Sequence, residues 1–198
     1  MRGGGTVNAD GFGIGRLEGT SARRYRRDRP MWADASLPDL AASVSSGAIL
    51  AAVRSATVGM AVTENACAPF LDGSWMFSHN GVVDGWPGSV ASLAAELPPE
   101  VLLTMEAPTD SAFLWALVRD RLRAGRSAAT ALAGVVEGVL ALAPGSRLNL
   151  LLHDGRQITA TTIVHALWLR QGRQRWRGQR HRQLRAPGPW RPAMGAGA

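Results

Sequence analysis

The sequence predicts a single domain that combines β-strands with α-helices, followed by an irregular tail. Its 198 residues are 46% hydrophobic, which is enough for one well-formed core. Short aromatic runs bounded by glycine, such as residues 74–78, have the composition of strands. Longer apolar runs that follow capping residues, such as 109–122 and 127–142, have the composition of helices.

The N-terminal segment predicts two strands after a patternless start. Residues 1–7 are glycine-rich, and we expect them to be disordered. In residues 8–15 three glycines alternate with Phe12 and Ile14. A dinucleotide-binding loop needs a strand before it and a helix after it, and this segment has neither. The alternation favours a strand whose small residues lie where another backbone comes close. Residues 25–29 predict the next strand, with arginines on a solvated face.

A helix and a strand lead to the first candidate binding residues. Ser36 as N-cap, with a proline and an acid in the first turn, predicts a helix that ends near Gly47. Residues 48–55 form an apolar run typical of a buried central strand. At its end, Arg54 is either an ordinary surface residue or, with the hydroxyl of Thr57, a grip on a substrate carboxylate.

The single cysteine, Cys67, bears on both compartment and catalysis. One cysteine excludes an internal disulfide and suggests a reducing compartment. The N-terminus has no apolar signal region and the longest apolar stretch, 128–143, is too short to span a bilayer comfortably, so we expect a soluble, cytoplasmic protein. As the sole thiol, Cys67 is a candidate nucleophile, but the lack of a neighbouring base favours a packing role in its loop.

The rest of the chain is organised around residues 74–81, Ser-Trp-Met-Phe-Ser-His-Asn-Gly. The strand ends on Asn80-Gly81, a pair that readily turns the chain and is typical of a hairpin. The alternative is an oxyanion hole. In that case the Asn80 amide and the Gly81 N–H point at one spot, where the oxygen of a tetrahedral intermediate sits.

A second candidate binding residue lies at the start of a helix. A short helix is predicted over 89–97, before two prolines close it. In the longer helix that begins near 109, Thr109 is a plausible N-cap and Asp110 occupies the first turn. Asp110 either only stabilises the positive end of the helix dipole or holds a substrate ammonium group.

The C-terminal third predicts a hairpin and then loses its pattern. Residues 147–153 and 157–163 read as two strands joined by a turn at Asp154-Gly155. Nine arginines and no acid follow Asp154, so without them 13 arginines face 15 acids and the body has a net charge of −2, against +7 for the whole chain. We expect residues 167–198 to be a disordered Arg/Gly/Pro-rich tail.

Two interpretations of this tail remain open. Arginines with interleaved Trp176 suit phosphates and base stacking, which indicates non-specific nucleic-acid binding. However, the chain contains no lysine, which indicates a GC-rich gene, and GC-rich codons read out of frame give such mixtures of Arg, Gly, Pro and Ala. A frameshifted terminus is the favoured interpretation.

Four motifs in one order carry a resemblance to a known family. They are Asn-Ala-Asp-Gly-Phe-Gly at 8–13, Val-Arg-Ser-Ala-Thr at 53–57, Ser-His-Asn-Gly at 78–81 and Thr-Asp-Ser at 109–111. Together they resemble the class II glutamine amidotransferase domain of the N-terminal-nucleophile hydrolases, over residues 8–164. Within that family, residues 51–60 together with Ala68-Pro69-Phe70 and residues 78–81 most resemble the γ-glutamyl-hercynylcysteine sulfoxide hydrolases of ergothioneine biosynthesis.

The resemblance implies a fold and a set of site residues. The implied fold is α+β, a four-layer αββα sandwich that lacks its first strand here, in a domain over 8–166. It implies that Arg54 and Thr57 hold the glutamyl α-carboxylate, Asp110 the α-ammonium, and Asn80 and Gly81 the oxyanion. The reaction cleaves a γ-glutamyl amide through a thioester, and we expect no cofactor and no metal ion.

One departure from the family separates two hypotheses. The family uses an N-terminal cysteine whose own amine is the base. Here Arg2 follows Met1, and Cys67 is far from that position. We therefore expect either a hydrolase of small γ-glutamyl substrates that is inactive as written, with its true start upstream, or a non-catalytic protein that binds glutamyl groups or nucleic acid.

Overall fold

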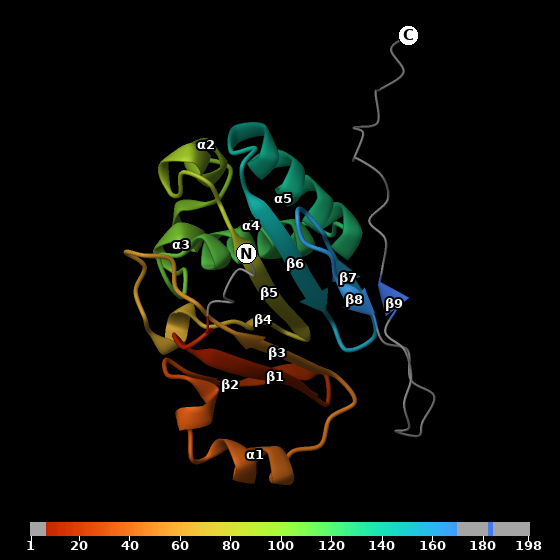
Figure 1. Cartoon of the computed structure of the whole chain (residues 1–198). Coiled ribbons are helices and arrows are strands. Elements are labelled where there is room, and N and C mark those ends of the chain that lie inside the picture. Colours follow the sequence, from red (N-terminus) through yellow and green to blue (C-terminus); the bar gives the residue numbers. More distant parts are fainter. Residues whose placement is uncertain (1–6, 170–181, 184–198) are drawn as a thin grey trace.

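The computed structural model describes residues 7–169 and 182–183. Figure 1 shows two main antiparallel sheets with helices on their outer sides, and a separate pair of short strands. The predicted disorder of residues 1–7 falls almost wholly outside this range. Residues 170–181 and 184–198, most of the predicted tail, also lie outside the described residues.

The first sheet holds β1 (Phe12–Glu18), β2 (Ser21–Arg27) and β3 (Ile49–Val53) in the order β2-β1-β3. The prediction of a central, buried strand over 48–55 was wrong. β3 is an edge strand, and its alternate residues Ile49 and Val53 are 54% and 49% exposed. A continuous apolar run does not distinguish an edge from a centre, because position in a sheet depends on which other strands pair with it.

The glycines of β1 confirm the predicted close approach of another backbone. A Cβ atom at Gly13 would collide with the carbonyl oxygen of Ala68, and one at Gly15 would lie 2.7 Å from the ring of Pro69. Side chains at either position would therefore push the 67–69 segment away from the first sheet.

The second sheet holds β4 (Phe70–Asp72), β5 (Trp75–Val82), β6 (Arg147–His153) and β7 (Ile158–Ala160) in that order. The hairpin predicted around Asp154-Gly155 is confirmed by the pairing of β6 with β7. The interpretation of Asn80-Gly81 as a hairpin turn was wrong. β5 continues to Val82, and these two residues pair with Asn149 and Leu148 of β6.

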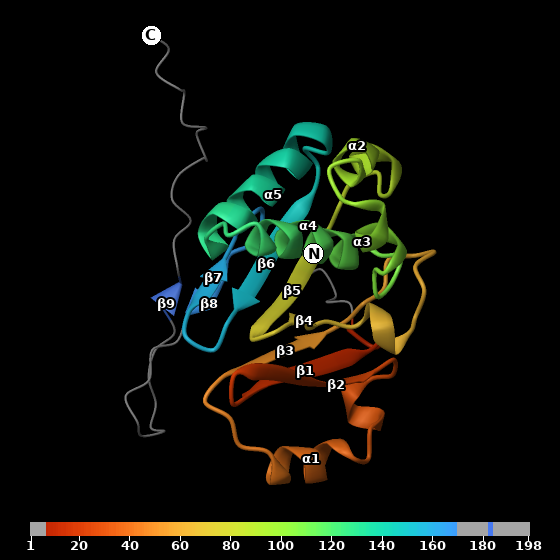
Figure 2. The ribbon, with the colours of Figure 1, turned by 180° about the vertical axis from the view of Figure 1, so that it is seen from behind.

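The larger helices lie on the second sheet, as Figures 1 and 2 show from opposite sides. The helices are α1 (Leu37–Ser43), α2 (Ala91–Ala94), α3 (Pro99–Leu103), α4 (Asp110–Arg123) and α5 (Ala128–Leu142). The predicted N-cap at Thr109 is confirmed, because its Oγ1 accepts a hydrogen bond from the N–H of Ala112 at 3.2 Å. Ser36 precedes α1 but makes no capping hydrogen bond.

The main hydrophobic core fills the space between the second sheet and the helices α4 and α5. Phe77 of β5 stacks on Trp115 of α4, with ring centroids 5.4 Å apart. Val135 and Val139 of α5 are fully buried. A smaller cluster of Ala48, Leu50 and Met76 joins the two sheets. α1 lies beyond the first sheet and has no buried residue, so this outer layer is thin.

These layers confirm the predicted α+β class, with two antiparallel sheets between helices. Two short strands, β8 (Trp168–Leu169) and β9 (Arg182–Gln183), pair with each other beyond the predicted domain end at 166, and that boundary stays a prediction. No helix in the described part of the chain is long and apolar enough to cross a membrane.

Candidate active site

All five predicted site residues lie in the wall of one cavity of about 580 Å³. They are Arg54, Thr57, Asn80, Gly81 and Asp110. The cavity opens where the end of β3, the end of β5 and the N-terminus of α4 meet. The fold therefore brings together segments that are up to 56 positions apart in the sequence, although the roles of the five residues stay predictions.

The backbone of Arg54 is held by hydrogen bonds, whereas its guanidinium group has a nitrogen without a partner in the part of the chain that the structure describes. Its N–H donates to Gly11 O at 2.8 Å, and its carbonyl accepts from the N–H of Asp10 at 3.0 Å, which extends the pairing of β1 with β3. The carboxylate of Asp10 also accepts from the N–H of Ala56 at 2.8 Å, so it shapes the loop that carries Thr57. The Nη1 atom of Arg54 is buried without a hydrogen-bond partner within the described residues. A buried guanidinium nitrogen without a partner is costly, and an anionic ligand would remove that cost.

Asp110 is a buried carboxylate, only 5% exposed, at the N-terminus of α4. Its Oδ2 accepts from the N–H of Val83 at 3.1 Å and its Oδ1 from the N–H of Ser111 at 2.7 Å. The bond from Val83 ties the start of α4 to the chain just after β5, whereas the bond from Ser111 is local to the first turn of the helix. A carboxylate has about four acceptor positions, so Asp110 can also accept from a cation in the cavity.

Asn80 and Gly81 reach the cavity from a regular strand. Residue 81 needs to be glycine because a Cβ atom there would collide with the carbonyl oxygen of Arg147 and lie 2.7 Å from Nε2 of His79. The need for glycine is therefore a close approach between strands and not a turn with positive φ. The exposed Asn80 side chain remains available to a ligand.

His79 links the strand that carries Asn80 to the helix that carries Asp110. Its Nε2 donates to the carbonyl oxygen of Arg147 at 3.1 Å, so Nδ1 of the neutral ring accepts from the Ser111 hydroxyl at 3.0 Å. Burial lowers the pKa of His79 most strongly; the charge of Asp110 raises it and the charge of Arg147 lowers it. The imidazole is therefore held in the neutral form that this pair of hydrogen bonds needs.

Cys67 also lines the cavity, but its thiol is poorly suited to attack a substrate. The residue is fully buried, and its Sγ lies 3.4 Å from Arg27 O and 3.5 Å from Thr63 O. Burial raises the pKa of this thiol despite the nearby charges of Arg54 and Arg26. A neutral thiol is a weak nucleophile, so the packing role favoured from the sequence suits its environment.

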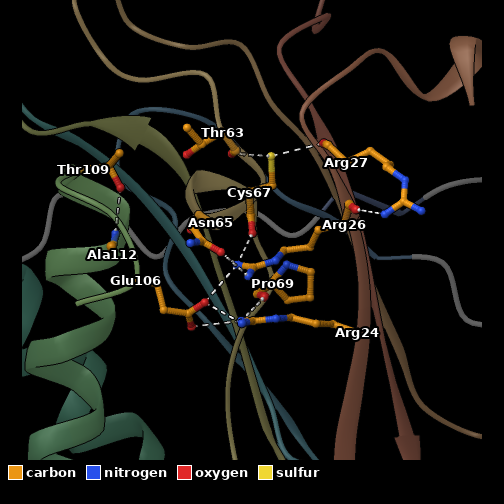
Figure 3. A network of polar contacts seen from close by, with 10 residues as sticks. All are labelled: Arg24, Arg26, Arg27, Thr63, Asn65, Cys67, Pro69, Glu106, Thr109 and Ala112. Atoms are coloured by element: carbon orange, nitrogen blue, oxygen red, sulfur yellow. Dashed lines mark hydrogen bonds and ion pairs between the residues drawn. The ribbon is translucent and has the colours of Figure 1, made fainter. Parts of the chain in front are cut away.

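An ion-pair cluster supports the cavity from the first sheet (Figure 3). Arg24 and Arg26 of β2 both bind Glu106, which lies four residues before Asp110. Arg26 also donates to Cys67 O at 3.3 Å, and its side chain is only 10% exposed. The expectation that the arginines of 25–29 lie on a solvated face was wrong for Arg26, because its side chain, like that of Arg24, points at the loop before α4.

Comparison with known proteins decides the family. The family profile described as glutamine amidotransferases class-II matches residues 1–174. The chain belongs to this family. Over 159 residues it is 40% identical to the γ-glutamyl-hercynylcysteine sulfoxide hydrolase of Mycolicibacterium smegmatis, covering 80% of this chain and 63% of that protein. The enzyme of the same name from Mycobacterium tuberculosis is 40% identical over 158 residues, covering 80% and 60%. The chain thus spans less than two thirds of these relatives' length.

Solved structures agree with the class-II amidotransferase assignment. A glutamine aminotransferase class-II domain protein from Silicibacter pomeroyi matches with a TM-score of 0.59 and 28% identity, over 77% of this chain and 68% of that one. The glutamine phosphoribosylpyrophosphate amidotransferase of Bacillus subtilis matches with a TM-score of 0.55 over 78% of this chain and 31% of that one. Its identity is only 15%, so this second match bears on the fold alone.

Sequence reasoning missed the residues that hold this amidotransferase cavity in shape. Asp10, His79 and Ser111 each lie inside one of the four motifs, and His79 and Ser111 are next to a predicted site residue, but their residue types alone indicate no positioning role. Glu106 and Arg147 lie outside every motif. No local signal identifies them, because their contacts depend on strands and helices that are distant in the sequence.

Proposed function

We propose that the cavity binds the glutamyl end of a γ-glutamyl amide and belongs to a hydrolase of such amides. One observation carries this proposal: the same cavity is lined by the Arg54 guanidinium, whose Nη1 has no hydrogen-bond partner within the described residues, and by the buried carboxylate of Asp110. An α-amino acid carries one carboxylate and one ammonium, which these two groups match in charge. Thr57 adds a hydroxyl beside Arg54.

The reaction follows from the other wall of the cavity. The family resemblance implies an N-terminal cysteine as nucleophile, and these 198 residues do not contain one. In an enzyme that has it, the thiolate attacks the γ-carbonyl carbon, and the Asn80 amide and Gly81 N–H stabilise the resulting oxyanion. Collapse of the intermediate breaks the C–N bond and releases an amine that takes up a proton. Water then hydrolyses the thioester to glutamate and restores the thiol. The substrate that the relatives' names support is γ-glutamyl-hercynylcysteine sulfoxide.

We also propose that the 198-residue chain binds this ligand without turning it over. Its one cysteine, Cys67, has a thiol that is buried and whose pKa is raised, chiefly by that burial. The test is to incubate the chain with γ-glutamyl amides and follow glutamate release. Robust release that is lost in Cys67→Ala would contradict the proposal, because it would make Cys67 the nucleophile.

Binding tests the glutamyl pocket itself. Arg54→Ala should weaken the binding of L-glutamine by roughly 2–4 kcal/mol, because a charge-assisted bidentate contact is lost, and Arg54→Lys should recover only part of it. Isothermal titration calorimetry measures both. Arg126→Ala is the matched control, since Arg126 is exposed between α4 and α5, away from the cavity. Unchanged affinity in Arg54→Ala would mean that the carboxylate is held elsewhere.

A further inference from the structure

We infer that Arg147 reads the leaving group of the substrate and selects amides of α-amino acids, in which the departing nitrogen is next to a carboxylate. This inference rests on the proposed function, because it takes Arg54 and Asp110 as the partners of the glutamyl group. It adds a specificity-determining residue on the opposite side of the scissile bond.

The charges that line the cavity are the first reason. The formally charged lining residues are two arginines and one aspartate: Arg54, Arg147 and Asp110. A bound glutamyl group, with one carboxylate and one ammonium, matches Arg54 and Asp110 and leaves Arg147 without a counter-charge. Free glutamine releases ammonia, which has no carboxylate for Arg147 to bind. A leaving group that is itself an amino acid carries a second carboxylate, which the Arg147 guanidinium can bind.

The strand register places the Arg147 side chain on the correct face. Arg147 is opposite Val82 in the β5–β6 ladder, and Asn149 is opposite Asn80. Opposed residues of an antiparallel pair project to the same face, and alternate residues along a strand share it. Arg147 therefore shares a face with Asn80 and with Met76, which packs in the cluster between the two sheets.

The distance to the reacting bond is also suitable. On one face of an antiparallel pair, diagonal neighbours such as Asn80 and Arg147 lie roughly 7–8 Å apart at the backbone, within reach of a long side chain. The oxyanion and the departing nitrogen are bonded to the same carbon, so if the Asn80 amide holds the oxyanion, a substituent on that nitrogen can extend toward Arg147. The guanidinium is then placed to meet a carboxylate one carbon away from that nitrogen.

Arg147 has no competing partner and its charge acts on the cavity. None of the ion pairs formed by the described residues includes Arg147, and only its carbonyl oxygen forms a side-chain contact, with His79. Arg147 itself lines the cavity, together with Asn80, Gly81 and Val82 of β5. The cavity of about 580 Å³ is also of the size that holds ligands larger than one amino acid.

The test compares two ligands that differ in one group. γ-Glutamylglycine and γ-glutamylethylamide share the glutamyl amide, but only the first carries a carboxylate on its leaving group. We expect the full chain to bind γ-glutamylglycine about tenfold more tightly in calorimetry, as one charge-assisted contact predicts. Arg147→Gln should abolish this preference and leave the affinity for the ethylamide unchanged, while Arg147→Lys keeps part of it. Arg156→Gln, an exposed arginine at the β6–β7 turn, is the matched control.

The outcomes separate the two proposals. If both ligands bind equally and Arg147→Gln changes neither affinity, the leaving-group role is wrong and the glutamyl pocket stands. If Arg147→Gln weakens both ligands equally, Arg147 holds the glutamyl carboxylate itself, which also overturns the inference. If neither ligand binds the folded chain, the proposed function fails and this inference fails with it.

Discussion

At the scale of single residues, the cavity depends on side chains that hold other side chains in place. His79 lies beside Asn80 on β5 and accepts a hydrogen bond from Ser111 on α4, so its imidazole links the strand that carries Asn80 to the helix that carries Asp110. The same ring donates to Arg147 O on β6. Gly81 allows the close strand contact that this link requires. The proposed binding groups are therefore positioned by neighbours that would not touch the ligand.

The lowered pKa of His79 predicts a pH dependence of stability. An unfolded histidine titrates near ~6.5, so at higher pH both states hold a neutral ring. As the pH falls below that value, the unfolded state binds a proton at this ring while the folded state does not. The free energy of unfolding therefore decreases as the pH falls from about 6.5 to the lower pKa of the folded state. Asp110 opposes this shift and Arg147 adds to it.

Replacing the titrating ring should remove this dependence. His79→Gln should cost about 1 kcal/mol at pH 8, since an amide only partly replaces the two hydrogen bonds, and should flatten the loss of stability below pH 6.5. Urea unfolding at a series of pH values measures both effects. His165→Gln, at an exposed histidine, should keep the wild-type slope. An unchanged slope in His79→Gln would place the titrating group elsewhere.

At the scale of elements, two arginines of β2 hold the segment that leads into α4. Glu106 accepts from Arg24 and from Arg26, each at 2.9 Å, and the three side chains are between 10% and 25% exposed. This cluster connects the first sheet to the loop before the Thr109 cap (Figure 3). The position of Asp110 thus depends on a contact between two layers.

Neutralising Glu106 should therefore destabilise the fold and disturb the cavity. Glu106→Gln leaves two partly buried guanidinium groups facing each other, and we expect a loss of about 1–3 kcal/mol after allowing for solvent screening. Glu96→Gln is the matched control. Glu96 is 55% exposed and pairs with Arg121 at 3.4 Å, so its change should stay within about 0.5 kcal/mol. Equal midpoints for the two variants in urea unfolding would refute the structural role of this cluster.

At the scale of the whole molecule, the charge of the chain is unevenly distributed. Residues 170–198 carry eight arginines and no acid, whereas the remainder is close to neutral. The family profile ends at residue 174, within the first part of this segment. The electrostatic behaviour of the protein toward polyanions should therefore follow the C-terminal residues and not the two-sheet domain.

Removing residues 170–198 tests this expectation. The shortened chain should keep its stability within roughly 0.5 kcal/mol, because the deleted β9 pairs with β8 and joins neither main sheet. It should also lose all affinity for DNA and RNA, because a near-neutral body releases few counterions. Titration of the intact chain with several oligonucleotides at rising salt should show a steep loss that does not depend on sequence. Tight, selective binding at ~0.15 M ionic strength, where exposed charges are screened beyond ~8 Å, would instead indicate an evolved nucleic-acid module.

The sequence by itself determined the family, the α+β class, the Thr109 cap of α4 and the hairpin around Asp154-Gly155. These features depend on ordered motifs and on local preferences of neighbouring residues, which a linear pattern contains. It also pointed to the five residues that share the cavity wall. It did not give the edge position of β3, the continuation of β5 through Asn80-Gly81, or the burial of Arg26.

Only the tertiary structure decided those points, because each depends on which distant segment lies alongside. Gly81 continues a strand because β6 pairs with it, and the absence of a Cβ atom lets Arg147 O approach. The side chain of Arg26 is only 10% exposed because Glu106, 80 positions later, supplies the opposite charge. Burial and partnership are properties of the packed chain, and the same residues in isolation favour a turn and a solvated face.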